Sequence, residues 1–343
     1  MRRAKPFEFG GITVKPGERA TAALPMARLY TNNEMTLPVQ VVHGRSSGPV
    51  LFVSAAVHGD EINGVEIIRR LLITRALKNL RGTLLAIPVA NPFGFIQRSR
   101  YLPDRRDLNR SFPGSLKGSL AGRLAHLFMS EIASRCDFGI DLHTGSNFRS
   151  NLPQIRASLD DQKTIELASA FGAPIVVPSE LREGSLREAV AALGKPVLVY
   201  EGGEALYFNE SVIRTGLRGI LKVMRHTGML AANKRLKHRE PIVTDRTSWV
   251  RASMSGTFSL NVKLGDLVKK KTPIGVLSDP FGDDREDVLA PFTGVVIGQL
   301  NLPLAHEGDA LIHLAKVPDP EEAEEALDEY TSSLTDEDFG LER

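Results

Sequence analysis

The sequence predicts an α/β protein built on a mostly parallel, mixed β-sheet flanked by helices, with a second, all-β sandwich domain at its C-terminal end. Between residues 36 and 230, apolar strand-like runs alternate with amphipathic helix-like runs. The strand-like runs are almost continuously apolar, which is typical of strands that helices cover on both faces. After residue 240 the pattern changes to short strands and turns, and this change predicts the second domain.

Short strands and longer helices are expected to alternate in the first domain. The expected strands are Leu37–Val42, Val50–Val57, Thr83–Val89, Phe138–His143, Pro174–Val177 and Val197–Glu201. The expected helices cover residues 61–78, 119–135, 160–172, 184–193 and 209–229. In such sheets, active residues gather beyond the carboxyl ends of the strands, so we expect the functional site there.

Five segments are expected along the chain. They are an N-terminal extension with strands (1–35), the large α/β domain (36–232), a charged linker (233–240), the β-domain (241–316) and an acidic tail (317–343). The tail holds eleven acidic residues and one base, so its net charge is −10. Because the whole chain has a net charge of +2, residues 1–316 carry a net charge of +12. We expect the tail to be solvated or partly helical, and the basic body to attract anionic small molecules.

Composition excludes several classes of protein. The chain is 42% hydrophobic and 24% charged, as in ordinary globular proteins. It has no apolar run long enough for a membrane span and no signal-peptide core at its start, so a soluble cytoplasmic protein is expected. Only 6% of residues are aromatic and none interleave with a basic stripe, so no nucleic-acid partner is expected. Cys136 is the single cysteine and is expected to pack in the interior.

The β-domain contains two similar segments. Val250–Phe258 and Val288–Val296 resemble each other, and each is followed by a Gly-Asp pair. This pseudo-repeat resembles the biotinyl/lipoyl-type β-sandwich, which presents a lysine for cofactor attachment at a hairpin tip. The corresponding turn, residues 278–284, has no lysine. We therefore expect no attached biotin or lipoyl group, and a role as scaffold, lid or oligomerisation element.

Two short motifs at the ends of expected strands carry metal-binding groups. His58-Gly-Asp-Glu61 follows the run that ends at Val57, and His143 closes Asp141-Leu-His143. Two imidazoles and one carboxylate make a three-ligand zinc site whose fourth position is open to water, which is the pattern of catalytic zinc. We therefore expect one Zn²⁺ per chain and a metallohydrolase.

Each motif has an ordinary structural explanation when it is taken alone. Glu61 could stabilise the positive end of the following helix, and His143 could be a hydrogen-bonded core histidine. The combination of these motifs with the groups described next favours the functional interpretation.

A polar loop and a strand-end carboxylate complete the constellation. The loop, residues 91–115, holds Arg98, Arg100, Arg105, Arg106 and Arg110. Long loops inside compact domains are usually functional, and an arginine beside an amide, as in Asn109-Arg110, suits a carboxylate. A solvated basic loop is the alternative. Glu201 ends an apolar strand before Gly202-Gly203, where a carboxylate close to a metal site suits a general base.

As a set, these motifs resemble the zinc carboxypeptidase superfamily, and within it the succinylglutamate desuccinylase/aspartoacylase family. In the family's order, the matching pieces are His58-Gly-Asp-Glu61, Asn91-Pro-Phe-Gly-Phe95, Arg100-Tyr101 leading to Asp107-Leu-Asn-Arg-Ser-Phe-Pro-Gly114, Asp141-Leu-His143 and Glu201-Gly-Gly203. The resemblance covers residues 36–230 and implies that residues 36–232 form a zinc hydrolase domain.

The resemblance also implies a role for individual residues. His58, Glu61 and His143 would bind zinc, and Glu201 would pass a proton from water to the leaving amine. Arg100 would stabilise the oxyanion; Arg98, Arg105 and Arg106 are rivals, because the segment before Asp107 is longer than in aspartoacylases. Asn109 and Arg110 would hold the substrate carboxylate. Asp107 and Asp141 would accept hydrogen bonds from the zinc-bound imidazoles.

The expected protein is a zinc-dependent amidohydrolase that deacylates an N-acyl amino acid, of N-acetyl or N-succinyl type, with metal-activated water. A zinc carboxypeptidase acting on a short peptide is the alternative enzyme, and a non-catalytic metal-binding scaffold protein is the alternative outside enzymes. The expected partner is an anionic N-acyl small molecule, and the β-domain is compatible with a homo-oligomer. The acyl group, the amine and any role of Tyr207 stay open.

Overall fold

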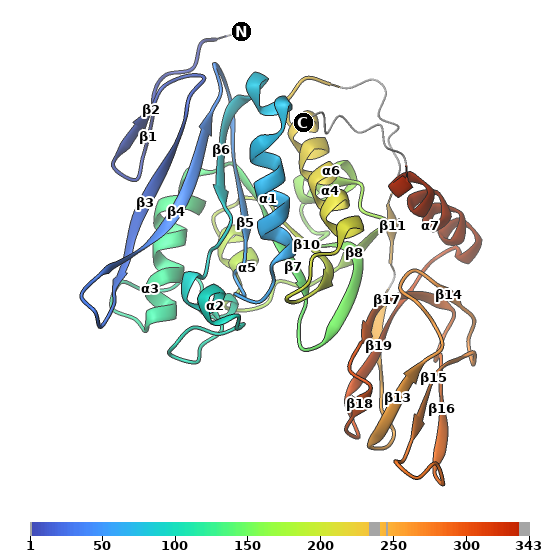
Figure 1. Cartoon of the computed structure of the whole chain (residues 1–343). Coiled ribbons are helices and arrows are strands. Elements are labelled where there is room, and N and C mark those ends of the chain that lie inside the picture. The colour runs from blue at the N-terminus through green and yellow to red at the C-terminus, as the bar shows by residue number, and fades with distance from the viewer. Residues whose placement is uncertain (1, 233–240, 245, 336–343) are drawn as a thin grey trace.

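The computed structural model describes residues 2–232, 241–244 and 246–335, and a 13-stranded mixed sheet forms its largest element (Figure 1). In spatial order the main strands are β12 (Arg246–Arg251), β19 (Ala310–Lys316), β17 (Gly294–Leu300), β8 (Arg149–Ala157), β10 (Val197–Glu204), β7 (Phe138–Gly145), β5 (Ser46–Ala55), β6 (Arg81–Ile87), β4 (Glu34–His43) and β3 (Arg19–Arg28). Three further strands lie off this order: β9 (Ile175–Pro178) pairs with β8, β11 (Ile242–Val243) pairs with β9, and β14 (Leu267–Val268) pairs with β17.

The centre of the sheet is parallel and its two ends are largely antiparallel. Strands β6, β5, β7 and β10 pair in parallel, whereas β4 pairs antiparallel with β6, and β8 pairs antiparallel with β10. All eight residues of β7 are buried, as expected of a strand covered on both faces. The sheet is mixed, as expected, but the expected parallel majority holds only for the central strands.

Helices cover both faces of the central strands (Figure 1). One face carries α1 (Asn63–Ile73), α4 (Gln162–Phe171) and α6 (Glu210–His226), and the other carries α3 (Leu120–Leu127) and α5 (Leu186–Ala191). Ile68, Phe171 and Ile220 belong to the core of the first face, and Phe52 and Phe128 to the core of the second. Burial of these two apolar layers is the main favourable contribution to folding.

Side-chain caps fix where several helices begin. Asp161, Ser185 and Asn209 each accept a hydrogen bond from the backbone N–H three residues later, at the starts of α4, α5 and α6. These caps satisfy N–H groups that have no partner within the helix. The helix starts expected from the sequence, at residues 160, 184 and 209, lie within two residues of the observed starts of α4, α5 and α6.

Two expected segments differ from the structure. The helix expected over 119–135 is α-helical only to Leu127, and continues as a π-turn (Phe128–Ile132) and a 3₁₀ turn (Ala133–Arg135). The loop expected over 91–115 contains α2 (Pro92–Gln97) and a 3₁₀ turn (Leu108–Arg110). Asn91 caps α2, and Pro92 lies in its first turn. This pair is a helix-start signal, but the polar, arginine-rich sequence around it led to the prediction of a loop.

The N-terminal segment adds strands to the fold. A hairpin of β1 (Phe7–Phe9) and β2 (Ile12–Val14) precedes β3, which pairs with β4 along ten residues. Phe9 and Val14 are buried in the same core as Phe52. This segment therefore covers the second face of the sheet at its β3 end.

The C-terminal strands form two groups. One group, β13 (Gly256–Leu260), β15 (Pro273–Ser278), β16 (Arg285–Leu289) and β18 (Leu304–Ala305), makes a separate four-stranded sheet. The other group (β12, β14, β17 and β19) joins the main sheet, because β17 pairs with β8 at Gly298 and Asn151. Both groups share a core that includes Phe258, Leu277 and Ile312. The expected linker, 233–240, lies outside the described residues.

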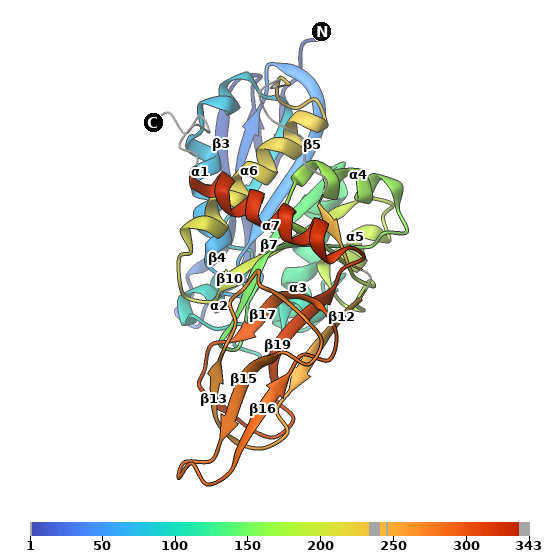
Figure 2. The same ribbon diagram turned by 90° about the vertical axis from the view of Figure 1, so that its right-hand side faces the viewer.

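The acidic tail begins with a helix that packs on the body of the protein. α7 (Pro320–Thr335) crosses close to α6 (Figure 2). It buries Ala323 and Leu327, and the hydroxyl of Tyr330 lies 2.8 Å from the hydroxyl of Thr215 on α6. The partly helical tail that the charge pattern predicts is thus docked along its apolar stripe. Residues 336–343 lie outside the described part of the chain.

Two further expectations concern single features. None of the helices in the described residues is long and apolar enough to span a membrane. Cys136 is 2% exposed, and burial raises the pKa of its thiol, so it packs in the interior as expected.

Candidate metal centre and active site

Two adjacent parallel strands bring the metal-binding motifs together. His58 and Glu61 lie in the turn between β5 and α1, and His143 lies in β7, whose Leu142 is the register partner of Ala55 at the end of β5. Gly59 shapes this turn, because a Cβ at that position would lie 1.9 Å from the carbonyl carbon of Gly94 in α2. The two sequence motifs are therefore packed directly against each other.

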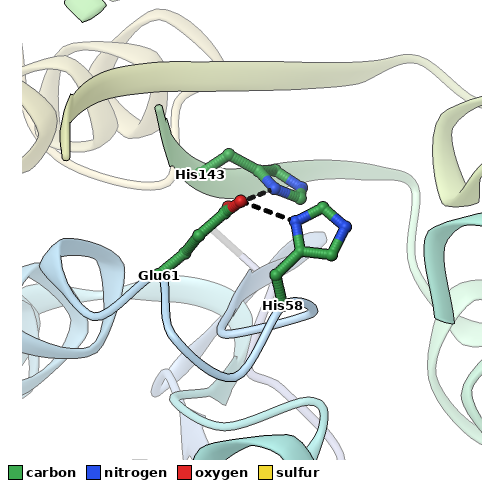
Figure 3. Close-up of side chains that lie close together, drawn as sticks. All are labelled: His58, Glu61 and His143. Carbon is green, nitrogen blue, oxygen red and sulfur yellow. Dashed lines mark hydrogen bonds and ion pairs between the residues drawn. The ribbon is translucent and has the colours of Figure 1, made fainter. Parts of the chain in front are cut away.

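His58, Glu61 and His143 form a compact buried cluster (Figure 3). Nδ1 of His58 lies 2.7 Å from Oε1 of Glu61, and Nδ1 of His143 lies 2.7 Å from Oε2 of the same carboxylate. The three side chains are 2–5% exposed, and one ligand atom from each lies within 4.8 Å of the others. The structure thus brings the three expected metal ligands to one point.

The charges in the cluster support one another. Burial alone would raise the pKa of Glu61, but the two imidazoles outweigh burial and hold it well below its usual range. Burial alone would lower the pKa of His143, but Asp141 and Glu61 raise it well above its usual value. The site therefore combines an ionised Glu61 carboxylate with a His143 ring whose protonated form the neighbouring carboxylates stabilise.

The far nitrogens of both imidazoles face carboxylates. Nε2 of His58 lies 3.2 Å from Asp107, and Nε2 of His143 lies 2.7 Å from Asp141. Asp141 also accepts a 2.7 Å hydrogen bond from the hydroxyl of Ser54. When both rings are neutral and carry their proton on Nε2, they donate outward to these carboxylates and direct both Nδ1 lone pairs to the space beside Glu61, a donor set that suits a divalent cation. The residues present fit a metal ion.

Among the loop arginines, Arg100 is the one that contacts the cluster. Its Nε and Nη2 donate to Asp107 at 3.1 and 2.8 Å, and its Nη1 lies 3.6 Å from Glu61. The rivals Arg98, Arg105 and Arg106 are exposed. A guanidinium beside the cluster is suited to stabilise negative charge on a reacting oxygen.

Asn109 and Arg110 lie on the same loop, farther from the cluster. Oδ1 of Asn109 accepts a 2.9 Å hydrogen bond from the backbone of Leu186, which ties the loop to the start of α5. Arg110 is exposed and its Nη1 donates to the Asn109 carbonyl. Burial, together with Arg182 and Arg100, lowers the pKa of Arg110 and outweighs the effect of Asp107. The Asn109 amide nitrogen and the Arg110 guanidinium are thus the groups that can meet an anion here.

Glu201 lies beside the cluster on the next strand. It is the register partner of His143 in the parallel pair β10/β7, so the two side chains leave the sheet on the same face. Its Oε2 accepts a 2.9 Å hydrogen bond from Asn151 and lies 3.0 Å from Nε of Arg156. The structure therefore places a carboxylate next to the metal-binding groups, at the end of a strand.

The sequence interpretation did not identify Asn151 and Arg156, because it did not predict their strand, β8. That strand contains Pro153 and polar residues in Ser150-Asn-Leu-Pro-Gln, which do not read as an apolar run. The signal that could have found it is the alternation of the apolar Pro153, Ile155 and Ala157 with polar residues between two expected strands.

A buried His₂Glu cluster at the carboxyl ends of parallel strands, with the Glu201 carboxylate and Arg100 beside it, is an arrangement typical of metallohydrolase sites on α/β folds. Comparison with known proteins supports this class. The profile of the succinylglutamate desuccinylase/aspartoacylase catalytic domain matches residues 47–227. The chain belongs to this family, which confirms the resemblance seen in the motifs.

Individual relatives agree with this assignment. The N-alpha-acetyl-L-2,4-diaminobutyric acid deacetylase of Halomonas elongata is 30% identical over 275 residues, which is 74% of this chain and 80% of the relative. A succinylglutamate desuccinylase of Pseudomonas aeruginosa is 28% identical over 140 residues, which is 38% of this chain and 41% of that protein.

Solved structures share the fold. The product-bound ectoine utilization protein EutE (DoeB) of Ruegeria pomeroyi has a TM-score of 0.77 at 25% identity, over 87% of this chain and 95% of that chain. A succinylglutamate desuccinylase from Silicibacter sp. TM1040 has a TM-score of 0.78 at 23% identity, over 88% and 94% of the two chains. The relatives are deacetylases and desuccinylases, so they support an amide-bond hydrolase.

Proposed function

We propose that this protein is a zinc-dependent deacylase that hydrolyses the amide bond of an N-acyl amino acid. The observation that carries the proposal is the convergence of His58, Glu61 and His143 on one buried point, with Glu201 beside them. Membership in the desuccinylase/aspartoacylase family supports the reaction class.

His58, Glu61 and His143 would hold the metal through two imidazole nitrogens and one carboxylate. Zinc accepts this ligand set and, when bound, lowers the pKa of water and polarises an acyl carbonyl. Asp107 and Asp141 would keep the imidazoles oriented, since each accepts from the far nitrogen of one ring.

Glu201 would act as the general base and then as the general acid. It would take a proton from the attacking water and give it to the nitrogen of the breaking amide bond, so that the products are a carboxylic acid and an amine. Its place beside His143 supports this role, because the acyl carbonyl would lie next to the metal that His143 would bind.

Two loop arginines would each bind a different negatively charged group of the substrate. Arg100 lies within 3.6 Å of Glu61 and would stabilise the oxygen on which negative charge develops. Arg110, with the amide nitrogen of Asn109, would hold the carboxylate of the amino-acid part of the substrate. An anionic N-acyl amino acid therefore suits the site in charge.

The proposal is tested by measuring amine release from N-acetyl and N-succinyl amino acids, N-acetyl-2,4-diaminobutyrate included, and from short peptides. The zinc-loaded protein is expected to turn over one N-acyl amino acid, and Glu201→Gln is expected to lose that turnover while keeping its metal. Turnover of peptides alone would instead assign a carboxypeptidase. Failure to retain stoichiometric zinc, measured by mass spectrometry of the metal content, would overturn the metal centre.

A further inference from the structure

The hydrogen bond that the Glu201 carboxylate accepts from the described residues is made at one of its two oxygens. Oε2 accepts the 2.9 Å hydrogen bond from Nδ2 of Asn151 and lies 3.0 Å from Nε of Arg156. Both groups come from β8, the neighbouring strand. Oε2 thus accepts one hydrogen bond and has a guanidinium beside it, whereas Oε1 accepts no hydrogen bond from the described part of the chain.

The donor Asn151 is itself enclosed by the C-terminal strands. It is 6% exposed, and its register partner on β17 is Gly298. A Cβ at Gly298 would lie 3.1 Å from Oδ1 of Asn151 and 3.1 Å from Cβ of His313 on β19. The absence of a side chain at 298 therefore leaves just enough room for the Asn151 amide to turn its nitrogen towards Glu201.

We propose that Asn151 is a positioning residue for Glu201, that Gly298 of the C-terminal strands keeps it in place, and that Oε1 of Glu201 is the oxygen that exchanges the proton. This inference rests on the role proposed above for Glu201. The hydrogen bond from Asn151 and the positive charge of the nearby Arg156 both act on Oε2, which orients the carboxylate and leaves Oε1 as the more available acceptor. The C-terminal strands then act on catalysis through one amide, without touching the reacting atoms.

The kinetic test compares Asn151→Ala and the isosteric Asn151→Asp with a control in the same region. Asn301→Ala is the matched control, because Asn301 bonds Ser150 and Glu204 on the same two strands, β8 and β10, and does not contact Glu201. Misplacing a catalytic group by a fraction of an ångström to 1 Å lowers rates by up to about a hundredfold. Both Asn151 variants are expected to lose about tenfold or more in kcat with KM and zinc content unchanged, whereas Asn301→Ala stays near the wild type.

Asn151→Asp separates donation from packing. It keeps the volume of the side chain but replaces the donor by an acceptor that faces Glu201, so it should lose at least as much kcat as Asn151→Ala. Gly298→Ala should give a smaller loss of kcat in the same direction. An Asn151→Asp variant with wild-type kcat would overturn the proposal, as would equal losses in Asn151→Ala and Asn301→Ala.

A second readout does not depend on activity or on the folding of the Asn151 variants. The side-chain amide of Asn151, selectively labelled with ¹⁵N, should show a changed chemical shift in Glu201→Gln and no change in Glu204→Gln, since only Glu201 accepts its hydrogen bond. An Asn151 resonance that ignores Glu201→Gln would show that the contact is absent. If the wild-type protein hydrolyses no substrate, the proposed function fails, and this comparison still decides whether Asn151 anchors Glu201.

Discussion

Glu201 and His143 are register partners on the parallel strands β10 and β7, and their side chains leave the sheet on the same face. This neighbour relationship joins an imidazole of the candidate metal cluster to a carboxylate outside the cluster of His58, Glu61 and His143. Strand pairing thus sets the proposed division between groups that would bind the metal and a group that would move the proton.

The first prediction concerns Glu201→Gln. The amide keeps the size of the side chain and can still accept from Asn151, but it cannot take a proton at neutral pH, so kcat should fall about 10²–10⁴-fold. Zinc content and thermal stability should stay unchanged. Glu204→Gln, three residues along the same strand, is the control and should keep its turnover; a Glu201→Gln variant with near wild-type kcat would contradict the assignment.

Asp107→Asn tests the carboxylate behind His58. Because Asp107 accepts from Nε2 of His58 and pairs with Arg100, its loss should weaken zinc affinity about 10–100-fold. Competition with a coloured chelator measures this affinity directly. Asp104→Asn, on the same loop, should bind zinc as tightly as the wild type; equal affinities in all three proteins would remove Asp107 from the metal site.

Arg100→Ala and Arg110→Ala should separate into different kinetic classes. Arg100 lies against Glu61, so its loss should lower kcat about 10²–10³-fold, as for a lost oxyanion donor. Arg110 would hold a part of the substrate that does not change in the reaction, so its loss should chiefly raise KM. Steady-state kinetics on one N-acyl amino acid distinguishes the two, and a kcat defect confined to Arg110→Ala would exchange the roles.

We expect the buried side chain of His313 to lower the free energy of unfolding at acidic pH. Burial, with a contribution from the neighbouring Arg156, lowers the pKa of His313 from 6.5 to about 3. Its ring is 3% exposed and stacks on Trp249 at 4.5 Å. Between these two pKa values the unfolded chain binds a proton that the folded chain does not, so this contribution to stability falls as pH decreases from about 6.5 towards 3.

The effect can be measured with His313→Phe, which keeps an aromatic ring but does not titrate. Thermal melts from pH 7 to pH 4 should show a steeper loss for the wild type, by up to about 1.4 kcal/mol for each pH unit. Parallel pH profiles for the two proteins would show that His313 titrates normally in the fold.

Gly219→Ala tests the packing of α6 on α4. A Cβ at Gly219 would lie 2.1 Å from the Phe171 ring, which is fully enclosed in the core, so the variant should lose about 1–3 kcal/mol of stability through overpacking. Gly122→Ala in α3 is the matched control. A Cβ there has no neighbour closer than 3.5 Å, so helix propensity should make that change neutral or stabilising. Urea unfolding measures both.

The candidate metal ligands could be predicted from the sequence because the two histidines stand at the ends of apolar runs and Glu61 follows His58 by three residues. Strand periodicity places His58 and His143 at one edge of the sheet, and the structure brings them together as expected. Pattern reasoning reached the ligands of the cluster because local signals, a strand end and a following helix, position them.

The surroundings of Glu201 could not be predicted in the same way. Asn151 and Arg156 lie on β8, a strand whose polar residues and Pro153 conceal it, and which is held by partners from β10, β9 and β17. Those pairings join segments that are far apart in the chain, so no local pattern announces them. The loop expected over residues 91–115 likewise contains the short helix α2, whose start at Pro92 is marked only by the Asn91 cap and by Pro92 itself.

Because β17 pairs with β8, the sheet of the family's catalytic domain, residues 47–227, continues into strands that lie outside that range. A fragment that stops before the C-terminal strands would leave the backbone groups of Arg149–Asn151 without their partners on β17. Such an unpaired edge is a template for aggregation. Exchanging the C-terminal strands between relatives would therefore replace strands of the hydrolase sheet itself. The new pairing would be between β17 and β8, and β8 is the direct neighbour of β10, which carries Glu201.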